Sequence, residues 1–260
     1  MSGNDKNSIL IGTSGFSYKD WLGNFYPQFC PDKDFLRFYA TRFKTVEIDS
    51  TFYRIPAIET VKRWGKVTPD NFVFTAKFPR TVTHEGSPES RIDTAEAFIR
   101  VMSNLEDKLG PLLLQFPYSF KPDDGFGFLD RLLDKLPTAF KYALEVRNRK
   151  WLNPRFYEML ADRNISLCHI DHPWMPEKTE YTAGFLYIRF LGDRRKIESD
   201  FTYIRNDREK ELNWWARLIE EFAYERGEVY SYFNNHYSGH SPSTAFRLLE
   251  ILSPNKNSKS

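Results

Sequence analysis

The 260-residue chain has little cysteine and no long hydrophobic run. Its two cysteines, Cys30 and Cys168, form no CxxC pair, which excludes a disulfide framework and is typical of a reducing compartment. No apolar stretch approaches the roughly 20 residues that span a bilayer. The polar opening, residues 1–8, lacks the charged and then apolar pattern of a secretory signal. We therefore expect a cytoplasmic protein with no membrane partner.

An excess of charge of one sign is missing as well. The 37 lysines and arginines nearly balance 35 aspartates and glutamates, which leaves a net charge of +2. A dedicated nucleic-acid-binding protein would carry a concentrated excess of positive charge, which this chain lacks. The chain is instead rich in hydrophobic residues (41%) and aromatic residues (17%), which is enough for a sizeable core.

Eight short apolar runs alternate with segments of helical periodicity, and most of the runs end in a polar residue. The runs are residues 8–13, 45–49, 72–77, 111–115, 141–146, 165–170, 185–190 and 228–233. The helical segments are 35–43, 58–66, 93–108, 128–136, a stretch beginning at 154, 208–226 and 242–252. Strands separated by helices predict an α/β protein with a parallel sheet and right-handed crossovers. Eight such units fit a single (β/α)8 TIM-type barrel, which closes at about 250 residues.

One connection departs from the pattern, and one other architecture competes. Residues 172–178 contain two prolines, which predicts that the sixth helix is reduced or missing. An open doubly wound sheet would show the same alternation, but residues 12–15 lack the third glycine of its phosphate turn. Because no linker divides the chain, we predict one barrel domain over residues 1–253 and a polar tail over 254–260.

Polar residues at the strand ends are the candidate site. Alternate residues of a strand share a face, so Glu47 is expected to lie with Asp49, and Glu145 with Arg147. The carboxyl ends of barrel strands converge on one face, where the active sites of such enzymes lie. We therefore expect one mouth to hold Glu47, Lys77, Gln115, Glu145, Arg147, Asp171, Arg189 and Asn234.

This set suits an enzyme that performs acid–base chemistry on a small polar or anionic substrate. The predicted catalytic residues are Glu47, Lys77, Glu145 and Asp171, with the two glutamates as acid and base. Arg147 and Arg189 would hold substrate charge, while Gln115 and Asn234 would supply neutral hydrogen bonds. Hydrolase, isomerase and lyase reactions all stay open.

The sequence allows three roles for the Lys77 side chain. It could pair with Glu47, hold an anionic substrate, or form a Schiff base if it is desolvated. We expect no organic cofactor and no metal ligands. The pair His169 and Asp171 is nevertheless compatible with a divalent metal, and that alternative stays open.

A second hypothesis is a protein that binds nucleic acid or a nucleotide without catalysis. Two basic loops, residues 147–150 and 194–196, accompany aromatic residues in the loops after the first two strands. Aromatic and basic side chains together stack on single strands. The predicted ring of carboxylates would repel phosphate, which favours the enzyme. Nothing in the sequence indicates the oligomeric state.

Several motifs resemble the YecE-like family, a group of TIM-barrel proteins with no established activity. They are IGTSGFSY (11–18), VEIDSTFY (46–53), FTAK (74–77), LQFP (114–117), EVR (145–147), YIR (187–189) and FNNH (233–236). The resemblance spans nearly the whole chain and implies a TIM barrel. It implies recurring family positions at Glu47, Thr51, Tyr53, Lys77, Gln115, Glu145, Arg147, Asp171, Arg189 and Asn234, which adds Thr51 and Tyr53 as substrate-binding candidates.

Two positions depart from the family pattern. Asn148 stands where the family usually has a histidine after the arginine of the fifth strand. Leu191 stands where the family usually has a histidine before a glycine after the seventh strand. A mechanism that depends on these two imidazoles is therefore not expected in this chain.

Overall fold

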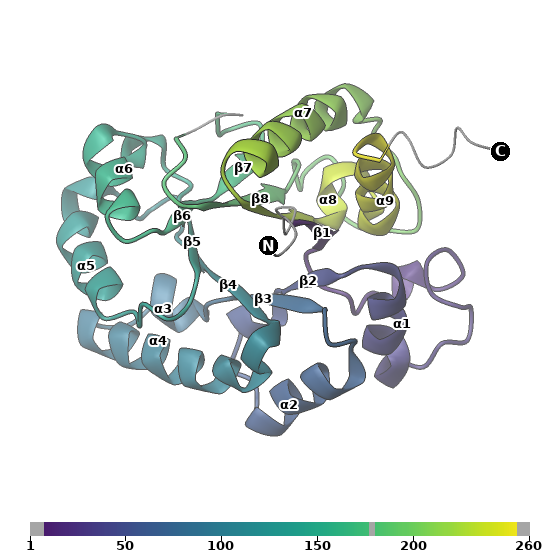
Figure 1. Ribbon diagram of the computed structural model, residues 1–260, viewed down its shortest axis with the longest axis horizontal. Coiled ribbons are helices and arrows are strands. Elements are labelled where there is room, and N and C mark those ends of the chain that lie inside the picture. Colours follow the sequence, from purple (N-terminus) through teal and green to yellow (C-terminus); the bar gives the residue numbers. More distant parts are fainter. Residues whose placement is uncertain (1–7, 177–179, 254–260) are drawn as a thin grey trace, which may run out of the picture.

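The computed structural model describes residues 8–176 and 180–253, and these form an α/β barrel with the strands inside a ring of helices (Figure 1). The predicted tail, residues 254–260, lies outside the described residues. The strands are β1 (Ile9–Thr13), β2 (Thr45–Ile48), β3 (Val73–Lys77), β4 (Leu109–Gln115), β5 (Tyr142–Glu145), β6 (Ser166–Leu167), β7 (His169–Asp171), β8 (Phe185–Phe190) and β9 (Glu228–Phe233). All eight predicted runs form strands in these places.

The nine segments close as the eight staves of a TIM barrel. Every strand pairing is parallel, in the orders β1-β9-β8-β7 and β2-β3-β4-β5-β6. The segments β6 and β7 are one stave interrupted at Cys168, with β6 paired to β5 and β7 paired to β8. Between β1 and β2, the Gly15 N–H donates to the Glu47 carbonyl at 2.7 Å. The predicted (β/α)8 fold is confirmed.

The β1–β2 seam depends on a side chain from a helix. The hydroxyl of Tyr39 accepts a hydrogen bond from the Thr13 N–H at 2.9 Å and donates to the Thr45 carbonyl at 3.1 Å. The two backbones approach closely here, since a Cβ on Gly12 would lie 2.3 Å from the Thr45 carbonyl oxygen. Gly12 therefore permits the approach, and Tyr39 joins the backbone groups that the two strands do not pair directly.

The outer ring contains seven long helices and two short ones among the described residues. They are α1 (Phe35–Arg42), α2 (Ile58–Val67), α3 (Arg80–Thr83), α4 (Pro88–Met102), α5 (Pro122–Asp134), α6 (Pro154–Ala161), α7 (Glu209–Glu225), α8 (Asn235–Ser238) and α9 (Ser241–Ile251). Both α4 and α5 begin earlier than predicted, each with proline in its first turn, where the missing N–H costs nothing. Within its described part, the proline-rich connection from β7 to β8 contains no helix.

The barrel interior is a small core that is separate from the larger core beneath the helices. Its buried members are Leu10, Leu113, Ala143, Cys168, Ile170, Phe185, Tyr187, Tyr230 and Tyr232. Two of the tyrosine hydroxyls are bonded to threonines, Tyr187 to Thr75 at 3.0 Å and Tyr232 to Thr45 at 2.6 Å. This hydrogen-bonded floor closes the barrel below the candidate site.

The sixth stave faces the opposite way from the prediction. Cys168 and Ile170 point into the barrel, so their neighbours His169 and Asp171 point at the helices. The ring of His169 stacks on Tyr181, at 5.4 Å between ring centroids. The polar residues of this stave are thus buried under the outer layer, and the apolar ones line the interior.

None of the helices in the described ranges, 8–176 and 180–253, has the length and apolar character needed to cross a bilayer.

Candidate active site at the barrel mouth

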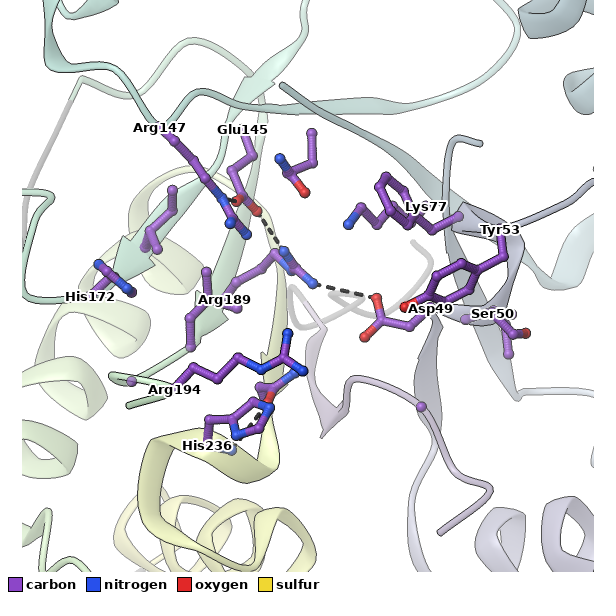
Figure 2. Close-up of a pocket in the computed structure, with 18 of the residues that line it drawn as sticks. Asp49, Ser50, Tyr53, Lys77, Glu145, Arg147, His172, Arg189, Arg194 and His236 are labelled. Atoms are coloured by element: carbon purple, nitrogen blue, oxygen red, sulfur yellow. Dashed lines mark hydrogen bonds and ion pairs between the residues drawn. The ribbon is translucent and has the colours of Figure 1, made fainter. Parts of the chain in front are cut away.

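A cavity of about 680 Å³ opens at the carboxyl ends of the strands (Figure 2). Of the ten predicted site residues, seven line it: Tyr53, Lys77, Gln115, Glu145, Arg147, Arg189 and Asn234. Glu47 lies buried below the lining, bonded to Arg189. Thr51 is also buried, and its hydroxyl donates to the carbonyls of Ile48 and Lys77, which ties the ends of β2 and β3 together.

Arg189 stands at the centre of this arrangement, with its guanidinium between two buried glutamates. Its Nη2 and Nε donate to Oε1 of Glu47 at 2.8 and 3.2 Å, and its Nη1 donates to Oε2 of Glu145 at 2.6 Å. Both glutamate side chains are fully buried, while that of Arg189 is 3% exposed. Buried charges persist only when paired and hydrogen-bonded, and this triad meets that condition.

Each glutamate has further partners that keep it ionised. Glu47 also accepts hydrogen bonds from the hydroxyls of Tyr187 at 2.7 Å and Ser14 at 2.8 Å. Burial alone would raise the pKa of Glu47, but the charge of Arg189 and these hydrogen bonds hold it below its usual range.

Glu145 is ionised for a similar reason. Burial acts to raise its pKa, but the charges of Arg189, Arg147 and Lys77 outweigh it and lower the pKa of Glu145 to about 2. Arg147 contributes directly, because its Nε donates to Oε1 of Glu145 at 3.0 Å. Neither glutamate therefore changes its charge near neutral pH.

Asp49 behaves differently from the two glutamates, although it lies on the same face of its strand as Glu47. Burial, followed by the negative charge of Glu47, raises the pKa of Asp49 to about 7. Its link to Arg189 is long, at 3.4 Å from Nη2 to Oδ1, and 29% of its side chain is exposed to the cavity. Asp49 is thus a carboxyl that exchanges protons near neutrality and that a substrate can reach.

Lys77 faces the same space as Asp49 (Figure 2). Burial, and then the positive charge of Arg189, lowers the pKa of Lys77 to about 8. Its Nζ lies 3.8 Å from the centroid of the Phe52 ring. The expected pairing with Glu47 does not form, because Glu47 is fully engaged by Arg189, Tyr187 and Ser14.

Two histidines border the mouth. His84 packs against Phe52 at 5.1 Å between ring centroids, and burial together with the charge of Lys77 lowers its pKa to about 4. His236 is fixed by a 2.6 Å contact between its Nδ1 and the Ile197 carbonyl, and burial lowers its pKa. Both rings are therefore neutral at pH 7.

Asp171 lies outside the cavity lining, contrary to the predicted mouth. Its Oδ2 accepts hydrogen bonds from the Trp215 indole and from the Tyr237 hydroxyl, each at 2.8 Å. The reversed facing of the sixth stave is the physical reason. Within the described residues, no three His, Cys, Asp or Glu side chains are grouped so as to hold a metal ion.

Several residues that line the mouth were not among the predicted site residues. They are Asp49, Tyr18, His84, His172, Arg194 and His236. The alternation of strand residues could have predicted Asp49 as a site residue. It could have predicted His172 only if the inward-facing residues of the sixth stave had been known. Arg194 and His236 come from loops beyond the strand ends, where alternation carries no information.

The two residues that depart from the family pattern, Asn148 and Leu191, lie in different surroundings. Asn148 is buried beside the mouth, where its Oδ1 accepts from the Lys150 N–H at 3.1 Å and its Nδ2 donates to the Tyr118 carbonyl at 3.1 Å. It begins the short 3-10 turn Arg149–Trp151. Leu191, in contrast, lines the cavity and adds an apolar surface.

Comparisons with known proteins cover most of the chain. A family model described as "Protein of unknown function DUF72" matches residues 10–260. The UPF0759 protein YecE of Escherichia coli (strain K12) is 37% identical over 157 residues, which are 60% of this chain and 55% of that protein. The chain thus matches just over half the length of this relative. The UPF0759 protein YunF of Bacillus subtilis (strain 168) is 27% identical, with 94% of each chain covered.

Solved structures share the fold. The crystal structure of a DUF72 family protein from Thermotoga maritima has a TM-score of 0.78 and 28% identity, covering 94% of this chain and 99% of that one. More distant enzymes share the barrel alone. The 3-keto-D-glucoside 4-epimerase of E. coli has a TM-score of 0.55 at 13% identity, with 96% of this chain and 100% of that chain covered.

Proposed function

The chain belongs to the family described as "Protein of unknown function DUF72", and from that premise we propose that it is an acid–base enzyme acting on a small anionic substrate at the barrel mouth. The family match confirms the resemblance to YecE-like proteins that the motifs indicated.

One observation carries the proposal: a carboxyl and an amine in one cavity both have pKa values moved toward neutrality from opposite directions. The pKa of Asp49 is raised to about 7, and the pKa of Lys77 is lowered to about 8. Catalytic acids and bases work best with pKa values near the working pH, and clusters of such perturbed groups in a cleft favour a catalytic site. We assign proton transfer to Asp49, with Lys77 as the second titrating group.

The charge of the lining favours an anionic substrate. Among the residues that the structure describes, four cationic side chains and two carboxylates line the cavity: the cations are Lys77, Arg147, Arg189 and Arg194, and the carboxylates are Asp49 and Glu145. Glu145 is already bonded to both Arg147 and Arg189. Arg194 reaches into the cavity from the opposite side to Lys77 (Figure 2), so a substrate anion would meet positive charge on two sides.

The proposal gives the two glutamates a role other than the acid and base roles that the sequence predicts. Glu47 and Glu145 stay ionised and bonded to Arg189, so neither can deliver a proton near neutral pH. Glycoside cleavage needs one protonated carboxyl opposite a second free carboxylate. The proposal therefore favours proton transfer of the isomerase or lyase type over hydrolysis. The glutamates would hold Arg189 in place for the substrate.

The alternative, binding of nucleic acid or a nucleotide, has one supporting observation. Trp174 lines the mouth with 57% of its surface exposed, and the guanidinium of Arg195 lies 5.1 Å from the centroid of its ring. Exposed aromatic and basic side chains suit stacking on a base. Such binding gives no part to the two groups whose pKa values lie near neutrality, Asp49 and Lys77, so we keep the enzyme as the main proposal.

A cytoplasmic location is part of the proposal. Its support is that Cys30 and Cys168 are both free thiols, as proteins of reducing compartments usually have.

Hydrogen–deuterium exchange tests the proposal even though the reaction is unidentified. The protein is incubated in D₂O with small oxo acids, hydroxy acids and sugar phosphates, and loss of substrate C–H signals is followed by proton NMR. We expect exchange on at least one compound. The variant Asp49→Asn should slow it by about 100-fold or more, the usual contribution of a general acid or base, while the ligand still binds.

The matched control is Asp70→Asn, which removes a fully exposed aspartate outside the cavity lining and should exchange at the wild-type rate. Exchange that proceeds equally fast in Asp49→Asn would contradict the proposal. A single-stranded oligonucleotide as the only compound that raises the melting temperature would support the alternative.

A further inference from the structure

The amine of Lys77 is placed as a nucleophile would be. The residue ends β3, on the interior face, and its side chain enters the cavity from the rim. No hydrogen bond or ion pair within 4 Å joins Nζ to another described residue. Its contact is the face of the Phe52 ring, 3.8 Å from the centroid, which positions the amine without occupying its nitrogen lone pair.

Lys77 differs in this respect from the two arginines whose charges act on it. Arg189 and Arg147 are both bonded to carboxylates, and Glu145 is bonded to both of them. A lysine whose only part was to balance these carboxylates would be expected to bond one of them. Lys77 instead stands apart from them at the edge of the cavity, with Asp49 facing the same space (Figure 2).

We propose that Lys77 forms an imine with the carbonyl group of a small anionic substrate, an aldehyde or 2-oxo acid. The inference rests on the proposed acid–base function and deepens it, because it names the substrate class and gives Lys77 a covalent part.

The step balances without any further reactant. The neutral amine attacks the carbonyl carbon, so a C–N bond forms as the C=O π bond breaks, and one of the two amine protons passes to the carbonyl oxygen to give a neutral carbinolamine. The C–O bond then breaks as the nitrogen lone pair forms the C=N bond, and the oxygen leaves as water with a proton from Asp49. The nitrogen proton returns to Asp49, so amine plus carbonyl gives imine plus water.

The surroundings of Lys77 favour both halves of this step. An amine attacks only when it is neutral, and burial with the charge of Arg189 lowers its pKa to about 8, so a useful fraction is neutral at physiological pH. The charged groups that act on it are Asp49, which follows β2, Glu145 at the end of β5, Arg147 just after β5, and Arg189 in β8. The arginines would hold the substrate carboxylate, and Asp49 would supply and recover the proton.

Reductive trapping tests the inference. The protein is treated near neutral pH with pyruvate or glyoxylate and sodium cyanoborohydride, and modified peptides are identified by mass spectrometry. We expect a secondary-amine adduct on Lys77, with the mass of the acid less one oxygen atom. The adduct should form on Lys77 at least about 10-fold faster than on the exposed Lys150. The reason is that each unit by which the pKa of Lys77 is lowered gives about tenfold more neutral amine.

Two variants make the result specific. Lys77→Arg keeps the positive charge and should lose the adduct, with circular dichroism to verify its fold, and Lys77→Met serves if the arginine is not accommodated. Asp49→Asn should keep the adduct site and slow its formation. Modification of wild-type Lys77 no faster than Lys150 with both probes would overturn the inference.

The two proposals fail in different ways. Proton exchange that survives Lys77→Arg, without an adduct in the wild type, would remove the imine and leave the acid–base function. A specific Lys77 adduct, with exchange unaffected by Asp49→Asn, would support the imine and remove the assigned function of Asp49.

Discussion

At the scale of single residues, the site depends on how one guanidinium divides its bonds among three carboxylates. Arg189 lies 2.8 Å from Glu47, 2.6 Å from Glu145 and 3.4 Å from Asp49. The two short contacts keep the glutamates ionised. The long contact leaves Asp49 beside the negative charge of Glu47, which makes ionisation of Asp49 costly. Carboxyl groups that share one arginine thus differ in their protonation near neutral pH.

The first prediction concerns the buried triad. Glu47→Gln removes one of the two short partners of Arg189 and leaves a buried positive charge less well compensated, so we expect the free energy of unfolding to fall by about 3–5 kcal/mol. Urea unfolding at pH 7 measures it. The matched control is Glu228→Gln, which breaks the solvent-exposed pair with Lys141 and should cost less than about 1 kcal/mol.

A loss in Glu47→Gln no larger than in Glu228→Gln would contradict the structural part assigned to Glu47. The acid or base role that the sequence predicts for Glu47 would affect turnover alone. Because Glu47 and Arg189 are buried, the substitution affects the core of the barrel as well as the site.

Residue types at the strand ends could be predicted from the sequence, but their protonation could not. Alternation put Glu47 and Asp49 on one face, and that is where both lie. Which of them is ionised depends on the position of Arg189, some 140 residues further along the chain. Charge that is determined by a contact between distant segments leaves no trace in local sequence.

At the scale of elements, the strands could be predicted because each is an apolar run bounded by polar residues. The residues at which helices begin were harder to predict. The prolines at the starts of α4 and α5 lie several residues before the first periodic apolar side chains, so the periodicity placed both helices too late. The sixth stave was misjudged because both of its faces are buried, and its polar residues bond to the helical layer.

The second prediction concerns the seam between β1 and β2. Tyr39→Phe would leave the Thr13 N–H and the Thr45 carbonyl without their buried partner, so we expect the free energy of unfolding to fall by about 1–3 kcal/mol. Chemical unfolding measures the change. Tyr224→Phe removes a hydroxyl from a side chain that is 88% exposed and should leave stability unchanged. Equal stability of both variants would show that the seam does not need the Tyr39 hydroxyl.

At the scale of the whole molecule, the barrel brings residues from position 15 to position 236 into one cavity. This convergence could be predicted from the eight-unit count, because a closed barrel gathers its strand ends on one face. The long β7–β8 and β8–β9 connections contribute Trp174 and Arg194 to the mouth, and their positions depend on loop paths that no periodic pattern describes.

The mouth also affects the stability of the whole fold. A raised pKa means that Asp49 favours folding below its unfolded pKa of 3.8, and this contribution is lost as the pH rises toward 7. The lowered pKa of Lys77 has the opposite sign: its contribution is present above 10.5 and lost as the pH falls toward 8. Near neutrality the fold therefore holds both groups at a cost in stability, which is typical of a functional site.

The most direct test of the central claim is the titration of the Asp49 carboxyl, followed by carbon-13 NMR of labelled aspartate and assigned by the signal that disappears in Asp49→Asn. We predict a midpoint near pH 7 in the wild-type protein, as the burial of this carboxyl beside Glu47 requires. A midpoint below about pH 5, in the ordinary range of aspartate, would contradict the account.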